Sequence, residues 1–195
     1  MTDEVELRDG SRLIVRPIRP EDAHALVALH ARLSADTIYR RYFGARPHLS
    51  PAAVDRFTRV DEYWRCALVG VRGSGELVAV ARYEGAEGST SAELAMVVDD
   101  ALQRTGVGTL MLDRLLDIAM ERGLHRIIAD VLTQNSPMLR LLRSTGLPAR
   151  TVRDDGVETV TVDISARPSD AVQRARARAH ITAARGRSTV PGTGS

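Results

Sequence analysis

The sequence predicts one α/β domain built on a mixed sheet, and three observations lead to this prediction. Extended and helical patterns follow one another as strands, helices, a three-strand meander, a helix, a strand, a helix and a final hairpin. This order differs from the regular strand and helix alternation of a doubly wound sheet. The length of 195 residues suits a single domain, and the hydrophobic content of 44% is that of an ordinary globular protein.

The first sixty residues predict a hairpin followed by three helices. Asp9-Gly10 is a hairpin turn signal between two extended runs. Pro20 and the two acids after it favour the first turn of a helix, and Ser34 or Asp36 is expected to cap the next one. The predicted elements are strands at 5–7 and 12–16 and helices from 20 to 33, from 34 to 43 and from 50 to about 58.

The rest of the chain predicts the meander, two helices and a closing hairpin. A loop with two glycines joins the first two extended runs of the meander, which indicates a hairpin. Gly123 and Gly146 follow helical patterns and predict where the helices end. The predicted elements are strands at 65–71, 77–83, 91–98 and 126–132, helices at about 105–122 and 136–145, and a hairpin of strands at 149–154 and 158–164.

Composition divides the chain near residue 166. Residues 1–166 are expected to form the domain, and residues 167–195, rich in Ala and Arg and then in Gly and Ser, a basic and partly disordered tail. The tail carries six arginines and one aspartate, a formal charge of +5, which leaves −3 for the domain out of +2 for the whole chain. Because the basic charge is confined to the tail, the sequence argues against nucleic acid as a partner.

Composition also excludes several classes of function. All 27 basic residues are arginine, so the lysine of a nucleotide-binding P-loop is missing. The five histidines show no metal-ligand spacing, and no apolar run reaches the ~20 residues of a membrane span. Cys66 is the single cysteine, and the N-terminus lacks the pattern of a secretory signal. We therefore expect a cytoplasmic protein without disulfides, metal or membrane contact.

The most informative segment runs from Gln103 to Thr109, between an expected strand and a long helix. Gly106 and Gly108 let the backbone approach a ligand closely. The N–H groups of the first helical turn have no partners within the helix, so they form an anion site, and Arg104 can add a charged hydrogen bond. The loop therefore suits a pyrophosphate.

This loop and its surroundings resemble a known family. Gln-x-x-Gly-x-Gly, preceded by an apolar strand with one acid and followed by Asn135 at the end of the next strand, is similar to the acetyl-CoA loop of the GNAT acetyltransferase superfamily. The resemblance covers about residues 12–164. The segment 33–43 and the residues after Asn135 resemble the GNAT domain of bacterial protein lysine acetyltransferases.

The resemblance implies a mostly antiparallel sheet in which two neighbouring strands splay apart to form the acetyl-CoA cleft. The pantetheine arm would lie along one of these strands, as an added half-strand would. Asn135 has a second interpretation, as the N-cap of the helix that follows it. The cofactor-binding residues expected from the loop and the resemblance are Met96, Val97, Val98, Gln103, Arg104, Thr105, Gly106, Val107, Gly108, Thr109 and Asn135.

Glu93 is the candidate general base. A free lysine amine has a pKa of ~10.4, so a base must accept a proton before or during attack on the thioester. Glu93 stands among apolar residues, where burial would raise its pKa, and strand alternation puts it on one face with Ala95 and Val97. In bacterial protein lysine acetyltransferases a glutamate at the matching place is the base. The alternative is a glutamate that faces solvent or pairs with an arginine.

The sequence departs from the family pattern at Leu142. Many GNAT enzymes carry a tyrosine there, which protonates the leaving thiolate. Leucine cannot do so, which leaves another group, water, or release as thiolate, since a thiol has a pKa of ~8.5. Ser136 and Ser144 are possible replacements, but no acid is assigned.

Three functions fit these observations. The first is an acetyl-CoA-dependent protein lysine acetyltransferase, and the second is a GNAT enzyme for a small-molecule amine. The third is a non-catalytic acyl-CoA-binding regulator, which Leu142 favours slightly and Glu93 argues against. The sequence makes no prediction of oligomeric state or acyl preference.

Overall fold

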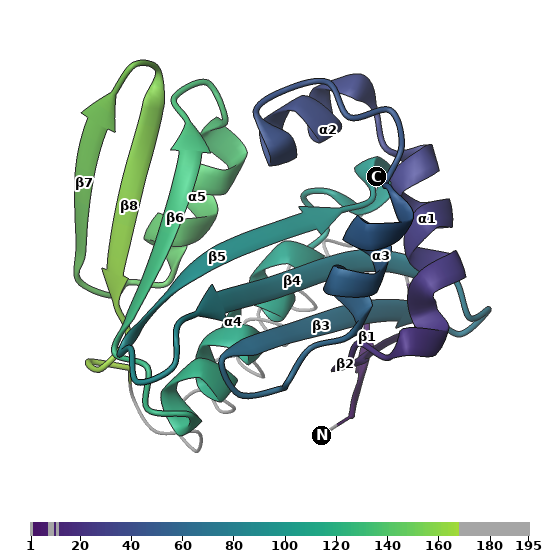
Figure 1. Cartoon of the computed structure of the whole chain (residues 1–195), viewed down its shortest axis with the longest axis horizontal. Helices are drawn as coiled ribbons and strands as arrows, with labels where there is room; N and C mark the ends of the chain where they lie inside the picture. Colours follow the sequence, from purple (N-terminus) through teal and green to yellow (C-terminus); the bar gives the residue numbers. More distant parts are fainter. Residues whose placement is uncertain (1, 8–9, 11, 168–195) are drawn as a thin grey trace, which may run out of the picture. The chain divides into compact units, whose positions relative to one another are not determined.

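The computed structural model describes residues 2–7, 10 and 12–167 (Figure 1), and the predicted basic tail lies almost wholly outside the described residues. The described strands form one sheet in the order β1-β2-β3-β4-β5-β6-β8-β7. They are β1 (Asp3–Glu6), β2 (Arg12–Pro17), β3 (Arg65–Arg72), β4 (Leu77–Gly85), β5 (Ser91–Val98), β6 (Arg126–Leu132), β7 (Ala149–Asp154) and β8 (Val157–Asp163). Every neighbouring pair is antiparallel except β5 and β6, so the predicted mixed and mostly antiparallel sheet is confirmed.

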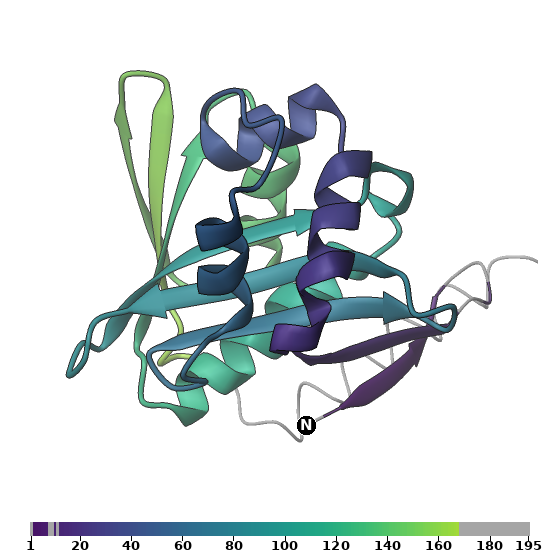
Figure 2. The same ribbon diagram turned by 45° about the vertical axis from the view of Figure 1, so that its right-hand side comes forward.

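Helices cover both faces of this sheet. They are α1 (Ala23–Arg32), α2 (Ala35–Tyr42), α3 (Pro51–Thr58), α4 (Val107–Glu121) and α5 (Ser136–Ser144), with short 3-10 turns η1 (Pro20–Asp22) and η2 (Asp100–Leu102). Figures 1 and 2 show α1 and α3 on one face of the central strands and α4 on the other. Two apolar clusters result, a large one beneath α4 and a smaller one beneath α1.

Local sequence explains where the helices begin and end. Ser34 accepts a hydrogen bond from the backbone N–H of Thr37 at 3.2 Å, so Ser34 is the N-cap of α2. Ser50 caps α3 in the same way, with Pro51 in its first turn. Gly123 has a φ of +80°, the left-handed conformation that stops a helix, and it follows α4 directly after its C-cap.

Strands β5 and β6 are paired over only part of their length. Their parallel ladder has three residue pairs, which end at Glu93 and Ile128. Beyond this point β5 continues to Val98 while paired with β4, and β6 continues to Leu132 while paired with β8. Among the described residues, the facing edges of β5 and β6 therefore diverge without pairing. The splayed strand pair is confirmed.

Candidate active site

A large cleft opens where β5 and β6 diverge. It has a volume of about 940 Å³, at the upper end of the range typical of small-molecule and cofactor sites. Its walls come from the two strands, from α2, from the loop before α4 and from α5. An extended ligand that lies along β5 would meet unpaired backbone groups of that strand, as an added strand would.

Gly106 forms the turn into α4 at one end of the cleft. Its φ of 99° and ψ of −9° are left-handed, a conformation that glycine adopts without steric cost. The N–H groups of the next residues point out of the helix end, because the first α4 hydrogen bond joins the N–H of Leu110 to the Gly106 carbonyl. A Cβ on Gly108 would lie 3.5 Å from Leu141 Cδ2 and 3.8 Å from Met96 Cε, so glycine keeps this part of the wall open.

The cleft brings together most of the residues predicted to bind the cofactor. Thr105 and Val107 are not among those that line it. The Thr105 hydroxyl donates to the Leu102 carbonyl at 2.6 Å, and Val107 is 0% exposed in the core, so it can offer only its backbone N–H. The predicted residues that line the cleft are Met96, Val97, Val98, Gln103, Arg104, Gly106, Gly108, Thr109 and Asn135.

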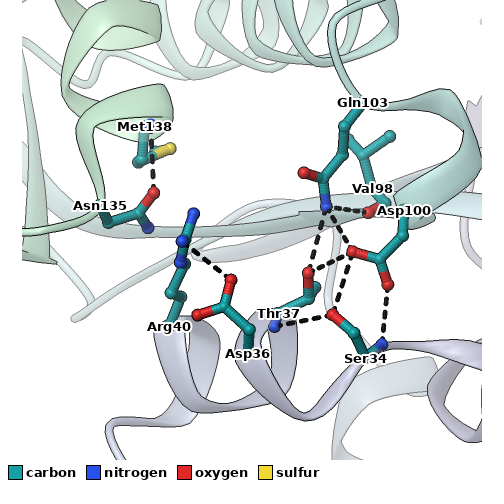
Figure 3. A network of polar contacts seen from close by, with 9 residues as sticks. All are labelled: Ser34, Asp36, Thr37, Arg40, Val98, Asp100, Gln103, Asn135 and Met138. Atoms are coloured by element: carbon teal, nitrogen blue, oxygen red, sulfur yellow. Dashed lines mark hydrogen bonds and ion pairs between the residues drawn. The ribbon is translucent and has the colours of Figure 1, made fainter.

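Gln103 and Asp100 fasten the start of α2 to the loop before α4 (Figure 3). The amide nitrogen of Gln103 donates to Thr37 Oγ1 at 3.1 Å and to Asp100 Oδ1 at 3.0 Å. Asp100 Oδ1 also accepts from the Thr37 hydroxyl at 2.5 Å, and Oδ2 accepts from the backbone N–H of Ser34 at 2.7 Å. Gln103 thus has a structural role in addition to its predicted cofactor contact, and Asp100 joins two walls of the cleft.

This network predicts a pH dependence of stability. Burial alone would raise the pKa of Asp100, but hydrogen bonds from Thr37, Ser34 and Gln103 outweigh it and hold the pKa below the ordinary 3.8. The ionised carboxylate therefore stabilises the folded state above pH 3.8, and this contribution is lost as the pH falls through the lower folded-state pKa. Asp100→Asn should lower the free energy of unfolding at pH 7 by about 1 kcal/mol, because asparagine offers one acceptor oxygen instead of two.

Denaturant unfolding at pH 7 and in steps between pH 5 and pH 2.5 measures this effect. The difference between wild type and Asp100→Asn should shrink as the pH falls. A difference that stays constant over this range would contradict the role of the ionised carboxylate.

Asn135 caps the helix that follows it and also lines the cleft. Its Oδ1 accepts from the backbone N–H of Met138 at 3.3 Å, so Asn135 is the N-cap of α5 (Figure 3). The residue also lines the cleft beside Met138. Because the cap uses only the carbonyl oxygen, the amide NH2 can still donate to a ligand. The cofactor contact of Asn135 stays a prediction.

Glu93 lies where β5 and β6 separate. Its side chain is exposed, so the expectation that it is buried is wrong. The reason is its position at the last residue pair with β6, next to the point where no strand covers β5. The predicted alternation is confirmed, because Leu94 is buried beneath α4 while Val97 packs against the cluster on the opposite face.

Leu142 lies away from the cleft. It is 3% exposed and packs in the core, while Met138 and Leu141 form the cleft wall on α5. The Ser144 hydroxyl borders the cleft but donates to the Leu141 carbonyl at 2.7 Å. The Ser136 hydroxyl accepts from Arg140 at 3.0 Å. Ser136 does not line the cleft, and the Ser144 hydroxyl proton is used within α5, so neither serine is placed to protonate a leaving thiolate.

The structure adds cleft residues that sequence reasoning missed. Thr37, Arg40 and Arg41 lie on one face of α2, at the spacing of three and four residues that aligns helical side chains, and they border the cleft. Arg140 of α5 borders it from the other side. The spacing of these α2 residues can be read from the sequence, but the direction in which their side chains point depends on how the helix packs. These guanidinium groups make the cleft suitable for an anionic ligand.

Other site types find no support in the part of the chain that the structure describes. It contains no group of three or more His, Cys, Asp or Glu side chains that could hold a metal ion. None of its helices is both long enough and apolar enough to cross a membrane. Cys66 is buried and unbonded to another cysteine.

Comparison with known proteins agrees with this geometry. A model of the acetyltransferase (GNAT) domain matches residues 12–148. The chain is 27% identical over 157 residues to acetyltransferase PA5475 of Pseudomonas aeruginosa, covering 79% of this chain and 84% of that protein. It is 32% identical over 164 residues to acetyltransferase Pat of Mycolicibacterium smegmatis, covering 82% of this chain but only 48% of that protein. The chain thus spans about half of the length of Pat.

A solved structure gives the same result. The GNAT domain of S. lividans PAT superimposes with a TM-score of 0.78 at 34% identity, covering 83% of this chain and 96% of that one. The cleft between splayed strands, the Gly106 turn and the open end of α4 fit the pantetheine and pyrophosphate of coenzyme A. The chain belongs to the GNAT acetyltransferase family, and acetyl-CoA is its acetyl donor.

Proposed function

We propose that the protein transfers the acetyl group of acetyl-CoA to the side-chain amine of a protein lysine by direct attack, with Glu93 as the general base. One observation carries this proposal. Glu93 lines both the large cleft and a second cavity of about 340 Å³ on the side of α3. An acceptor amine that enters the second cavity and a thioester in the first would meet at this carboxylate.

The proposed chemistry uses groups of β5. The amine nitrogen attacks the thioester carbonyl carbon, and the Glu93 carboxylate accepts the proton that the nitrogen loses. Backbone N–H groups of β5 beyond Glu93 stabilise the negative charge that develops on the carbonyl oxygen. When the carbon–sulfur bond breaks, the sulfur departs as a thiolate, which a thiol pKa of ~8.5 permits without a dedicated acid. This route removes the need for a proton donor at Leu142.

Acetyl transfer itself tests the function. The full chain is incubated with acetyl-CoA and either lysine-containing peptides or small amines such as 1,5-diaminopentane, and products are identified by mass spectrometry. We expect acetylation of the peptide lysine Nε. Products confined to small amines would assign the small-molecule function instead, and coenzyme A binding without turnover would assign the regulatory one. The protein contains no lysine, so it has no side-chain amine of its own that could be acetylated and mistaken for the product.

Release of coenzyme A can also be followed with a thiol reagent, provided that Cys66 does not react. Burial raises the pKa of the Cys66 thiol to about 11, so little reactive thiolate is present at pH 8. We expect the folded protein to show less than one-tenth of a thiol equivalent with 5,5′-dithiobis(2-nitrobenzoate) within minutes at pH 8, and one full equivalent in denaturant. Rapid modification of the folded protein would contradict the buried position.

We also propose a cytoplasmic location. The chain has one cysteine, which is buried and unbonded in the structure, so no disulfide adapts it to an oxidising compartment. Fractionation of cells that express the tagged protein, with markers for each compartment, tests this. Recovery with an extracellular or membrane marker would contradict it.

A further inference from the structure

The second cavity has an unusual lining. It lies between α2, α3 and the β4–β5 ladder and shares Glu93 and Arg41 with the acetyl-CoA cleft. Four guanidinium groups and two carboxylates border its 340 Å³, which leaves a formal excess of two positive charges. The charged residues are Arg41, Arg46, Arg56, Arg82, Glu84 and Glu93.

The carboxylate of Glu84 neutralises only part of this charge. Glu84 Oε1 accepts from Arg56, and Glu84 Oε2 accepts from Arg82 Nη2 at 2.7 Å. One carboxylate thus serves two guanidinium groups, and both of its oxygens are occupied. The remaining acid, Glu93, is the proposed base.

Arg82 has a buried donor that nothing in the described residues satisfies. The residue is 6% exposed, and its guanidinium lies over the Phe57 ring at 4.6 Å from the centroid. Its Nη1 is buried without a hydrogen-bond partner in the described part of the chain. An unpaired buried donor is costly, and a charged donor more so. An oxygen of a ligand in the cavity would supply the missing acceptor.

Arg41, on the last turn of α2, and Arg46, in the loop after α2, both border the cavity. Both guanidinium groups lie over the Tyr42 ring, at 4.9 and 4.7 Å from its centroid. The backbone of Arg46 is held by the buried His30, whose Nε2 lies 2.7 Å from the Arg46 carbonyl oxygen. Burial lowers the pKa of both Arg41 and Arg82, which means that each cation has lost hydration that a bound anion would replace.

The register of the sheet sets the distance between anion and amine. Arg82 is opposite Ala95 and Glu84 is opposite Glu93 in the antiparallel β4–β5 ladder. Arg82 and Glu93 are therefore diagonal neighbours on one face, a relation that corresponds to about 7–8 Å between backbones. A ligand carboxylate bound to Arg82 and a ligand amine bound to Glu93 would therefore be separated by about the length of one side chain.

We propose that this cavity is an anion subsite that selects acceptors with a carboxylate close to the reacting amine. The inference rests on the proposed acetyltransferase function and specifies its substrate class. The carboxylate can belong to an acidic residue beside the target lysine or to a small amino acid. Polyamines, which carry only positive charge, are disfavoured by the same cavity.

Paired acceptors test the subsite. The first pair is a peptide with Glu on both sides of one lysine and its counterpart with Gln. The second pair is 5-aminopentanoate and 1,5-diaminopentane. At a fixed ionic strength of 0.15 M we expect kcat/KM to be about tenfold higher or more for the acidic member of at least one pair, since hydrogen bonds to charged groups are the strong ones. The pair that shows the preference identifies the source of the carboxylate. Equal kcat/KM within both pairs would overturn the proposal.

Variants assign the preference to the cavity. Arg82→Gln and, because Arg82 is buried and this variant can fail to fold, Arg56→Gln should each reduce the preference for the acidic acceptor to threefold or less. The loss of kcat/KM in each variant should be larger for the acidic acceptor than for its neutral counterpart. Arg59→Gln is the matched control, because Arg59 is the C-cap of α3, pairs with Asp55 and does not border the cavity. A preference that survives both Arg82→Gln and Arg56→Gln would contradict the assignment.

Failure of the subsite and failure of the proposed function remain distinguishable. If neither member of either pair is acetylated, the acetyltransferase proposal fails, and the subsite is tested by calorimetry with glutarate as the probe. Glutarate binding that is lost in Arg56→Gln and kept in Arg59→Gln supports the subsite. No detectable binding of glutarate at millimolar concentration overturns it.

Discussion

Glu93→Gln should lower kcat/KM for a lysine peptide by about 10²–10⁴-fold, the range expected when a positioned general base is removed. Glutamine keeps the size of the side chain and cannot accept a proton. Because Glu93 is exposed at the junction of two cavities rather than packed in the core, the folded structure should be unaffected. The effect should therefore appear in turnover and not in stability.

Steady-state kinetics and calorimetry separate these contributions. The dissociation constant of coenzyme A should change less than threefold in Glu93→Gln. Glu87→Gln is the matched control, since Glu87 lies in the exposed turn between β4 and β5 and borders neither cavity. Wild-type activity in Glu93→Gln would remove Glu93 from the mechanism, whereas equal losses in both variants would point to an effect of overall charge.

Gly106→Ala should weaken coenzyme A binding by about tenfold or more. The φ of 99° at this position places alanine in a strained conformation, at a cost of about 1–2 kcal/mol. The space around a Cβ is open, so the strain is in the backbone and not in packing. The chain can relieve the strain only by rotating the turn, which would move the first N–H groups of α4 away from the pyrophosphate.

Gly88→Ala provides the control for backbone strain. Gly88 has a φ of +75°, has equally open space around a Cβ, and lies in the turn between β4 and β5 outside the cleft. Both variants should lose a similar free energy of unfolding, and only Gly106→Ala should lose affinity in calorimetry. Equal affinities for the two variants would mean that the α4 turn does not bind the pyrophosphate.

Local sequence signals were sufficient for most of the fold. The predicted bounds of the strand Ser91–Val98 and the strand Arg126–Leu132 agree with the structure, because apolar runs ended by loop residues define a strand without reference to distant residues. The turn at Gly106 was also predictable, since a left-handed residue before a helix calls for glycine at that one position.

The missed features depend on contacts between distant parts of the chain. The hydrogen bonds of Asp100 to Ser34 and Thr37 cross 66 and 63 positions of the chain. Glu93 was expected to be buried because its strand neighbours are apolar, but its exposure depends on where β6 leaves β5. The unpaired Nη1 of Arg82 likewise results from how α3 lies over β4. Patterns in one segment contain none of this information.

The short ladder between β5 and β6 has a consequence for the motions of the protein. In the described sheet, the ladder that joins the first five strands to the last three has three residue pairs. Amide protons on the open edge of β5 should therefore exchange with deuterium rapidly in the free protein and slowly once the pantetheine lies beside them. The cosubstrate then acts as a missing strand segment, and at 100 times its dissociation constant it should add about 2.7 kcal/mol to the free energy of unfolding.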